Sequence, residues 1–236
     1  MKKYLNKNEQ KETEEIINAS NRYDKTGYSV PLDADLWFLS YHYGKAAAFL
    51  AVYHMGDTHE GHPVDEVLLF TCPEERGKKR AKRLLEKYRE HVNSEYEEVR
   101  HVRFTAYPSE NTEDFLKHMK AVHEGDELLM TRALPGSGDL PGEDLTFSNE
   151  HSECSVRTYG DTAYIYGVRT DASHLREGSA ERLLTEVLAG LSEKGAGKAV
   201  LQVSSLNAPA LRLYEKLLFK VEERMELWYN NNLSNF

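Results

Sequence analysis

Apolar and polar positions alternate along the chain with two periods that follow each other in a fixed order. Two stretches, 81–92 and 180–191, carry apolar side chains at every third or fourth position, which predicts amphipathic helices. The apolar runs 102–106 and 199–203 follow them and favour β-strands, the second of them buried on both faces. Each half of the chain therefore reads as strand, loop, helix, strand, helix, strand.

Further strand candidates precede the helix in each half, with the spacing of an antiparallel meander. They are 36–43, 46–55 and 64–71 in the first half, and 145–149, 154–159 and 162–168 in the second. A charged stretch at 9–19 predicts an additional helix, which has no counterpart in the second half. We therefore expect the second half to lack the start of the fold.

The two halves are repeats of one unit. A shift of 99 residues aligns them without a gap, pairing Thr71 with Thr170, Ala81 with Ala180, Arg83 with Arg182, and Leu84-Leu85 with Leu183-Leu184. Downstream, Asn111 precedes His118 by seven residues, and Asn207 precedes Tyr214 by the same interval. Matched order and spacing over helices and strands indicate a duplication.

A stretch rich in glycine and proline lies between the repeats. Residues 134–142 hold three glycines and two prolines, a composition that interrupts helices and central strands. We predict an N-terminal domain at 1–134, a linker at 135–142 and a C-terminal domain at 143–236.

Composition narrows the class of protein. The 236 residues, 40% of them apolar and 29% charged, suffice for the packed core of an ordered protein. A net charge of −9 opposes general nucleic-acid binding, which needs a basic surface. No apolar run reaches the roughly 18 residues of a membrane span or forms a signal peptide. Cys72 and Cys154 give neither a disulfide framework nor metal spacing. We expect a cytoplasmic protein without nucleic-acid or membrane partners, of unassigned oligomeric state.

The segment between the meander and the amphipathic helix is the candidate site for an anionic ligand. The first N–H groups of a helix lack partners within it and carry partial positive charge, so they attract phosphate. Close approach to the backbone requires small residues, which Gly178, Ser179 and Ala180 supply in the second repeat. The basic run 78–80 in the first repeat either holds phosphate by charge or is a solvated helix start.

The order of these elements resembles the GCN5-related N-acetyltransferases (GNAT), most specifically through Asn-Ala-Pro-Ala-Leu-Arg-Leu-Tyr-Glu-Lys-Leu-Leu-Phe at 207–219. The resemblance covers most of both halves, as a tandem arrangement. It implies an α/β (α+β) fold of two fused domains, each a mixed, V-splayed central sheet flanked by helices, the C-terminal copy truncated at its start. It also implies acetyl-CoA (coenzyme A) as cosubstrate, bound in the C-terminal copy with its pantetheine arm in the splay.

Carried over by position, the resemblance assigns site residues in the C-terminal copy. The cofactor-binding candidates are Val168, Thr170, Arg176, Gly178, Ser179, Ala180 and Asn207. Tyr214 is the catalytic candidate, because a hydroxyl with a pKa of about 10 is protonated at neutral pH and can donate to the leaving thiolate. Tyr214 is otherwise a core tyrosine that packs a helix on the sheet, and Asn207 is otherwise a helix cap.

Both copies depart from the family's pyrophosphate loop, Gln/Arg-x-x-Gly-x-Gly/Ala. The second copy has Leu175 in the first position and Glu177 where an anion is expected. The first copy has Arg76 in the first position but Lys79 in the glycine position.

The helix after the next strand also departs from the family pattern. His118 stands in the place of the tyrosine in the first copy, as an acid or base or as an ordinary surface histidine. In the second copy, Leu218 replaces the usual glycine before Phe219.

The resemblance predicts an N-acetyltransferase that acts on a primary amine of a small molecule or a peptide. Tyr159, Tyr164 and Tyr166 either form an aromatic acceptor pocket or are ordinary strand tyrosines. The alternative function is a non-catalytic acyl-CoA-binding or interaction protein that retains the fold.

Three histidines crowd one short segment of the first half. His54, His59 and His62 offer imidazoles of the kind that bind zinc. We expect no metal site, because no predicted helix or strand fixes their geometry and a solvated hairpin tip accounts for them.

Overall fold

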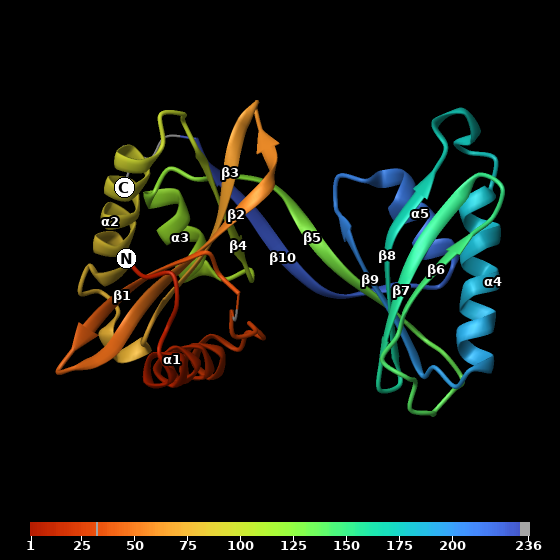
Figure 1. The fold of residues 1–236 in the computed structure, drawn as a ribbon, viewed down its shortest axis with the longest axis horizontal. Coiled ribbons are helices and arrows are strands. Elements are labelled where there is room, and N and C mark those ends of the chain that lie inside the picture. Colours follow the sequence, from red (N-terminus) through yellow and green to blue (C-terminus); the bar gives the residue numbers. More distant parts are fainter. Residues whose placement is uncertain (32, 232–236) are drawn as a thin grey trace. The chain divides into compact units, whose positions relative to one another are not determined.

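The computed structural model describes residues 1–31 and 33–231, which form two compact units (Figure 1). The first unit comprises Met1–Glu124 and the described residues from Glu226 onward, and the second comprises Gly125–Met225. Among the described helices, none is long and apolar enough to cross a membrane.

The first unit contains a five-stranded mixed sheet with the order β1-β2-β3-β4-β10. The strands are β1 (Leu36–His42), β2 (Lys45–His59), β3 (His62–Thr71), β4 (His101–Ala106) and β10 (Lys220–Asn230). The helices are α1 (Lys7–Asp24), the short η1 (Pro73–Glu75), α2 (Arg80–Glu95) and α3 (Glu110–His118). β3 and β4 are parallel, and the other neighbours are antiparallel.

The second unit repeats this plan with the order β6-β7-β8-β9-β5. Its strands are β5 (Val122–Ala133), β6 (Asp144–Ser148), β7 (Ser152–Tyr159), β8 (Thr162–Thr170) and β9 (Lys198–Ser204). Its helices are η2 (Ala172–His174), α4 (Ser179–Glu193) and α5 (Ala208–Lys216). β8 and β9 form the parallel pair here.

Both sheets splay open where the resemblance predicted. β3 pairs with β4 only as far as Val67 opposite Phe104, although β3 continues to Thr71. β8 pairs with β9 only as far as Ile165 opposite Leu201, although β8 continues to Thr170. The unpaired strand ends open into a V, so the mixed, V-splayed fold is confirmed.

The two units differ in how many faces of the sheet are covered. In the first unit, α2 and α3 pack on one core cluster and α1 on another, which includes Ile17 and Phe49. In the second unit, α4 and α5 pack on one cluster that contains Ile165. Side chains of β8 that alternate with this cluster, such as Tyr164 and Tyr166, are exposed. The missing counterpart of α1 explains this exposed face, as expected from the truncated start.

The last strand of each repeat contributes to the compact unit of the other repeat. β5 begins in the first unit, but its residues 127–133 pair with β9 of the second. β10 begins in the second unit, and its residues 226–230 pair with β4 of the first. The units thus differ from the predicted domains, which divided the chain in sequence order at 135–142.

The glycine-rich stretch 134–142 is packed within the second unit. Gly136 and Gly138 donate backbone hydrogen bonds to the carbonyls of Ala196 and Gly195, at 3.0 and 2.8 Å. A Cβ on Gly136 would overlap the backbone of both residues, so this position requires glycine for space. The stretch therefore closes one end of the second unit.

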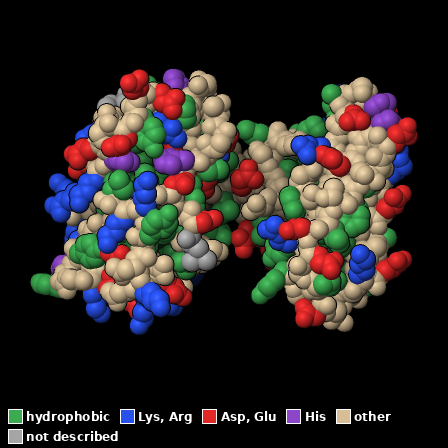
Figure 2. Space-filling view, viewed as in Figure 1, with side chains coloured by type: hydrophobic (Ala, Val, Ile, Leu, Met, Phe, Trp, Pro, Cys, Tyr) green, Lys and Arg blue, Asp and Glu red, His purple; other side chains and the backbone are tan. Residues whose placement is uncertain are grey.

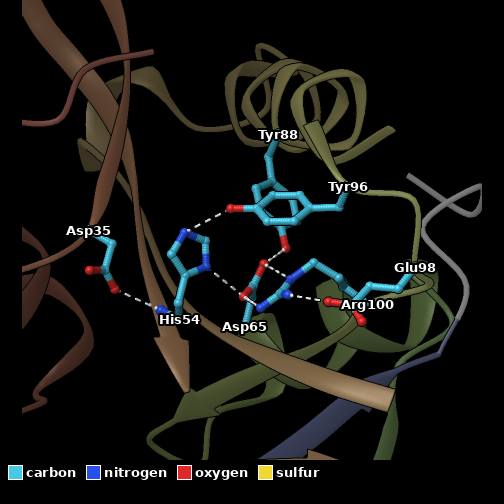
Figure 3. A network of polar contacts seen from close by, with 7 residues as sticks. All are labelled: Asp35, His54, Asp65, Tyr88, Tyr96, Glu98 and Arg100. Carbon is cyan, nitrogen blue, oxygen red and sulfur yellow. Dashed lines mark hydrogen bonds and ion pairs between the residues drawn. The ribbon is translucent and has the colours of Figure 1, made fainter. Parts of the chain in front are cut away.

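A buried polar network ties β3 to α2 in the first unit (Figure 3). Asp65, which is fully buried, accepts hydrogen bonds from Arg100 (2.5 and 3.0 Å), Tyr88 (2.5 Å) and His54 Nδ1 (2.8 Å). Burial alone would raise the pKa of Asp65, but the hydrogen bonds from Arg100, His54 and Tyr88 outweigh burial and lower it. Asp65 is therefore a buried carboxylate that stays ionised.

Candidate functional site

The loops after β3 and β8 have the same backbone conformation. Gly77 (φ 74°) and Lys79 (φ 58°) are left-handed in the first copy, and Arg176 (φ 68°) and Gly178 (φ 76°) are left-handed at the matching positions of the second. This conformation costs a residue other than glycine roughly 1–2 kcal/mol. Each copy has thus kept glycine at one of the two positions and carries strain at the other.

Among the described α-helices, the two that begin at these loops are the ones without a side-chain cap. α1, α3 and α5 start with Asn6, Ser109 and Asn207, whose side chains each accept a backbone N–H of the first turn. α2 and α4 start at Lys79 and Gly178, and no side chain caps them. Their first N–H groups are therefore available to an anionic ligand, with the helix dipole in its favour. A pyrophosphate group fits this donor set.

Ser179 and Ala180 begin α4, and Asn149 fixes the position of Ser179 through hydrogen bonds. Ser179 is buried, and its hydroxyl donates to Asn149 Oδ1 at 2.9 Å, while Asn149 Nδ2 donates to the Ser179 carbonyl at 2.9 Å. Asn149 also accepts the backbone N–H groups of His151 and Ser152. Ser179 therefore positions the loop through its side chain. Asn149 was not predicted as a site residue, because the sequence shows only an asparagine at a hairpin turn.

A bulge re-aims β8 just before the loop. Glu153 pairs with Arg169 and Ser155 with Tyr166, so Gly167 and Val168 lie opposite a single residue of β7, and Gly167 has a φ of 62°. Bulges commonly re-aim strands beside functional sites. The backbone from Val168 to Thr170 has no strand partner on the β9 side, so it offers pairing groups to an extended ligand. β3 pairs with β2 without interruption over the equivalent stretch.

The two arms of the V carry the two sets of predicted residues in the second copy. β8 leads to the loop with Arg176, Gly178 and Ala180, and β9 leads to α5 with Asn207 and Tyr214. An ion pair joins the arms, because the Lys216 ammonium group of α5 lies 2.7 Å from Glu181 in the first turn of α4.

The environment of Tyr214 combines a buried ring with an accessible hydroxyl. The side chain is 6% exposed and packs edge-on against Phe219 at 6.1 Å between ring centres. The Tyr214 hydroxyl has no hydrogen-bond partner among residues 1–31 and 33–231. In that part of the chain, Ser20 Oγ is the one side-chain polar atom that is both fully buried and without a partner. The Tyr214 hydroxyl is therefore not fully buried, and solvent reaches it. Burial, with a contribution from Cys154, raises the pKa of Tyr214. The hydroxyl thus stays protonated at neutral pH.

Asn207 acts as a helix cap, the alternative to cofactor binding that the sequence left open. Its side-chain oxygen accepts the N–H of Ala210 at 3.2 Å and caps α5. Leu218, in the glycine position after α5, has a φ of 63°, so the backbone keeps the turn that glycine usually makes.

The first copy has an open cleft in its splay. A cavity of about 1000 Å³ lies between the splayed ends of β3 and β4 and is lined by the loop, α2 and α3. Arg76, Gly77 and Lys79 line it on one side, and Asn111 and the exposed His118 on the other. The first copy therefore has room for an elongated ligand.

Carboxylates pair with much of the basic charge at this cleft. Asp24 binds the Arg76 guanidinium through two hydrogen bonds of 2.8 and 2.6 Å. Glu75 accepts from Lys78 at 2.7 Å and from Arg80 at 2.6 Å. The hydrogen bond from Lys78, with a further one from Arg80, lowers the pKa of Glu75 to about 2. Three of the four basic residues at 76–80 are thus already paired with carboxylates.

Of the three tyrosines that the sequence suggested for an acceptor pocket, two line the same pocket. Tyr164 and Tyr166 line a shallow pocket of about 420 Å³ together with Arg157. Tyr166 and Arg157 both hydrogen-bond Asp144. Tyr159 is 77% exposed and does not line this pocket.

On the face drawn in Figure 2, acidic and basic side chains are interspersed over both units.

Part of the chain matches a known protein family. The model of the acetyltransferase (GNAT) family matches residues 147–219, from the end of β6 through α5 of the second copy. The mycothiol acetyltransferase of Corynebacterium aurimucosum is 27% identical over 150 residues, which cover 59% of this chain and 47% of that protein. The chain thus spans about half the length of this curated relative.

Solved structures extend the likeness of fold to nearly the whole chain. A GCN5-related N-acetyltransferase from Sphaerobacter thermophilus has a TM-score of 0.67 at 15% identity, covering 92% of this chain and 90% of that one. A tandem GNAT protein from the clavulanic acid biosynthesis pathway has a TM-score of 0.61 at 13% identity, covering 96% of each chain. Residues 147–219 thus match the GNAT acetyltransferase family, and nearly the whole chain has the fold of a tandem GNAT protein.

Proposed function

We propose that this protein transfers the acetyl group of acetyl-CoA to a primary amine of a small molecule or peptide, and that the second copy performs the transfer. The observation that carries the proposal is the uncapped start of α4 at Gly178, next to the unpaired edge of β8. The family match over 147–219 supports the same copy. The named relative is a mycothiol acetyltransferase; the amine acceptor of this chain is proposed only by class.

The residues of the second copy divide the work of binding. The N–H groups at Gly178, Ser179 and Ala180 hold a pyrophosphate, and Arg176 adds positive charge at the same loop. The exposed backbone edge at Val168 and Thr170 pairs with the amide groups of a pantetheine arm. Asn207 keeps the start of α5 in place through its cap.

Tyr214 is the proposed proton donor. When bound, acetyl-CoA supplies an acetyl thioester. The attacking amine must be neutral, and a proton donor helps the sulfur depart, because a thiol of pKa about 8.5 is mostly protonated at neutral pH. The raised pKa of Tyr214 keeps its proton available, and its hydroxyl is accessible to solvent and has no competing protein partner within the described chain.

A second candidate function rests on the cleft of the first copy. Its volume of about 1000 Å³ suits an acyl-CoA, but His118 stands where the second copy has Tyr214, and β3 lacks the bulge. We propose that this cleft binds acyl-CoA without transferring the acyl group. That role corresponds to the non-catalytic alternative, confined to one copy.

Calorimetric titration with acetyl-CoA and a transfer assay test both proposals. We expect binding to the full chain, and release of free thiol that depends on an added amine from a panel of amino acids, polyamines, aminosugars and peptides. Thiol release abolished by changes in the second loop, but not the first, supports transfer in the second copy. Absence of binding heat would contradict both proposals, and binding without turnover across the panel would favour the non-catalytic alternative.

A further inference from the structure

The tip of the β2–β3 hairpin is more ordered than its sequence indicated. His59 pairs with His62 across a two-residue turn in which Glu60 (φ 51°) and Gly61 (φ 82°) are both left-handed. Such a turn matches the twist of the flanking strands and fixes their register. The reason for expecting no metal here, that nothing held the histidines, therefore does not apply to this tip.

A histidine from a distant part of the sequence joins the tip. β3 runs parallel to β4, and His101, the first residue of β4, lies opposite Val64 in this pairing. His59 Nδ1 and His101 Nδ1 are 3.0 Å apart. One ligand atom each from His59, Glu60 and His101 lies within 4.8 Å of the others. Two imidazoles and a carboxylate thus converge on one point.

Further contacts orient these groups. His59 Nε2 lies 2.7 Å from Glu124 Oε2; when Nε2–H donates to this carboxylate, the lone pair of the neutral ring is on Nδ1, on the side of His101. The His59 ring stacks on Tyr229 at 4.0 Å. A carboxylate behind a histidine is the usual support of a metal ligand, because it fixes the tautomer and raises ligand basicity. Asn231 Nδ2 in turn donates to Glu60 Oε2 at 2.9 Å.

His101 is held in a buried position at the start of β4, where it is 3% exposed. The His62 ring, with its centre 4.7 Å from that of His101, stands beside the same point.

From this geometry we infer that His59, Glu60 and His101 bind a divalent transition-metal ion, with Zn²⁺ the best match. Imidazole and carboxylate donors in a three-ligand set suit zinc and leave a fourth position for water or a nearby side chain such as His62. The ion joins the β2–β3 turn to the start of β4, which the sheet otherwise connects through backbone pairing. The site lies in the first unit and is independent of the proposed acetyl transfer.

Titration of the untagged, chelator-treated full chain with Zn²⁺ tests the inference, with Co²⁺ absorption spectra reporting the ligand geometry. We expect one tight site, a rise in melting temperature with Zn²⁺ and a tetrahedral Co²⁺ spectrum. Glu60→Gln, at the exposed turn, should weaken binding at least tenfold without unfolding the protein. Glu124→Gln removes only the support of His59 and should weaken binding roughly 10–100-fold.

A second pair of histidines provides the matched control. His151 and His174 stack at 3.6 Å in the second unit, next to Asp171 and Glu177, and are a histidine pair away from the proposed site (Figure 2 shows surface histidines in both units). His174→Ala should leave Zn²⁺ affinity and the Co²⁺ spectrum unchanged. The inference is overturned if Zn²⁺ does not bind, if Glu60→Gln and Glu124→Gln bind it as the parent does, or if His174→Ala abolishes the site.

Discussion

The two copies share a backbone and differ in the few residues that make a site. Both splay after the same short parallel pairing, and both loops place two residues in the left-handed region. The second copy has the bulge at Gly167, glycine at 178 and Tyr214, whereas the first has an uninterrupted β3, Lys79 and His118. The sheet framework therefore tolerates changes at the positions that we propose for cofactor binding and proton transfer.

The cores of the two units also differ, and here the first unit has the additional features. The first unit covers both faces of its sheet and contains the buried network around Asp65. The parallel pairing ends at Val67 in β3 and at Ile165 in β8. Asp65 and Ala163 each lie two residues before these ends, so they occupy equivalent places, and both are fully buried. The first unit is thus built with a charged, specific core, and the second with an apolar one.

The largest expected effect is on the stability of the first unit. Asp65→Ala mimics the second unit but leaves the Arg100 guanidinium buried without its carboxylate, which typically costs about 3–5 kcal/mol. Thermal and denaturant unfolding should show the first unit melting first, with the second unaffected. An unchanged melting curve would mean that the network contributes nothing.

The same network predicts a dependence on pH. Because the folded pKa of Asp65 is lowered, its contribution is complete above its ordinary pKa of about 3.9 and is lost as the pH falls through the folded pKa. Between pH 7 and pH 3, the stability difference between the parent chain and Asp65→Ala should therefore shrink only at the acid end.

The next largest effect separates the two loops. Gly178→Asp places a negative charge at the start of α4, where a pyrophosphate is proposed, and aspartate tolerates the left-handed backbone better than most residues. Like charges in contact cost several kcal/mol, so we expect roughly 1000-fold weaker kcat/KM for acetyl-CoA. The matched variant Lys79→Asp changes the same position of the first loop and should leave transfer intact while weakening any binding there. Equal loss of transfer in both variants would contradict the division of roles.

A smaller effect tests the proton donor. Tyr214→Phe keeps the ring that packs on Phe219 and removes only the hydroxyl, so kcat should fall about 100-fold with little change in KM. Tyr166→Phe, on the exposed face of β8, controls for loss of a tyrosine hydroxyl elsewhere. If kcat of Tyr214→Phe equals that of the parent, Tyr214 is a packing residue.

The sequence predicted what is local and missed what is brought together from afar. Periodicity located the helices and strands, and the resemblance to a family supplied the splay and the loop. Chain order could not reveal that β5 and β10 complete the other unit's sheet, or that His101 meets His59, because strand pairing is non-local. Nor could it reveal that Asp65 is buried, since an aspartate in a strand is usually exposed. Gly167 did carry a signal, because glycine within a strand often marks a bulge.

The smallest expected effect addresses the loops directly. Lys79→Gly and Arg176→Gly each replace the one left-handed residue of their loop that is not glycine, Lys79 at the position of Gly178 and Arg176 at the position of Gly77. Relief of roughly 1–2 kcal/mol of strain, less the 0.5–1 kcal/mol that glycine loses in chain entropy, leaves a gain of about 0.5–1 kcal/mol. Denaturant midpoints should rise by similar amounts in both variants, each in its own unit and with an unchanged slope. A gain in one copy only would mean that the other loop carries no strain, and that the two backbones, alike in φ, differ in how their surroundings hold them.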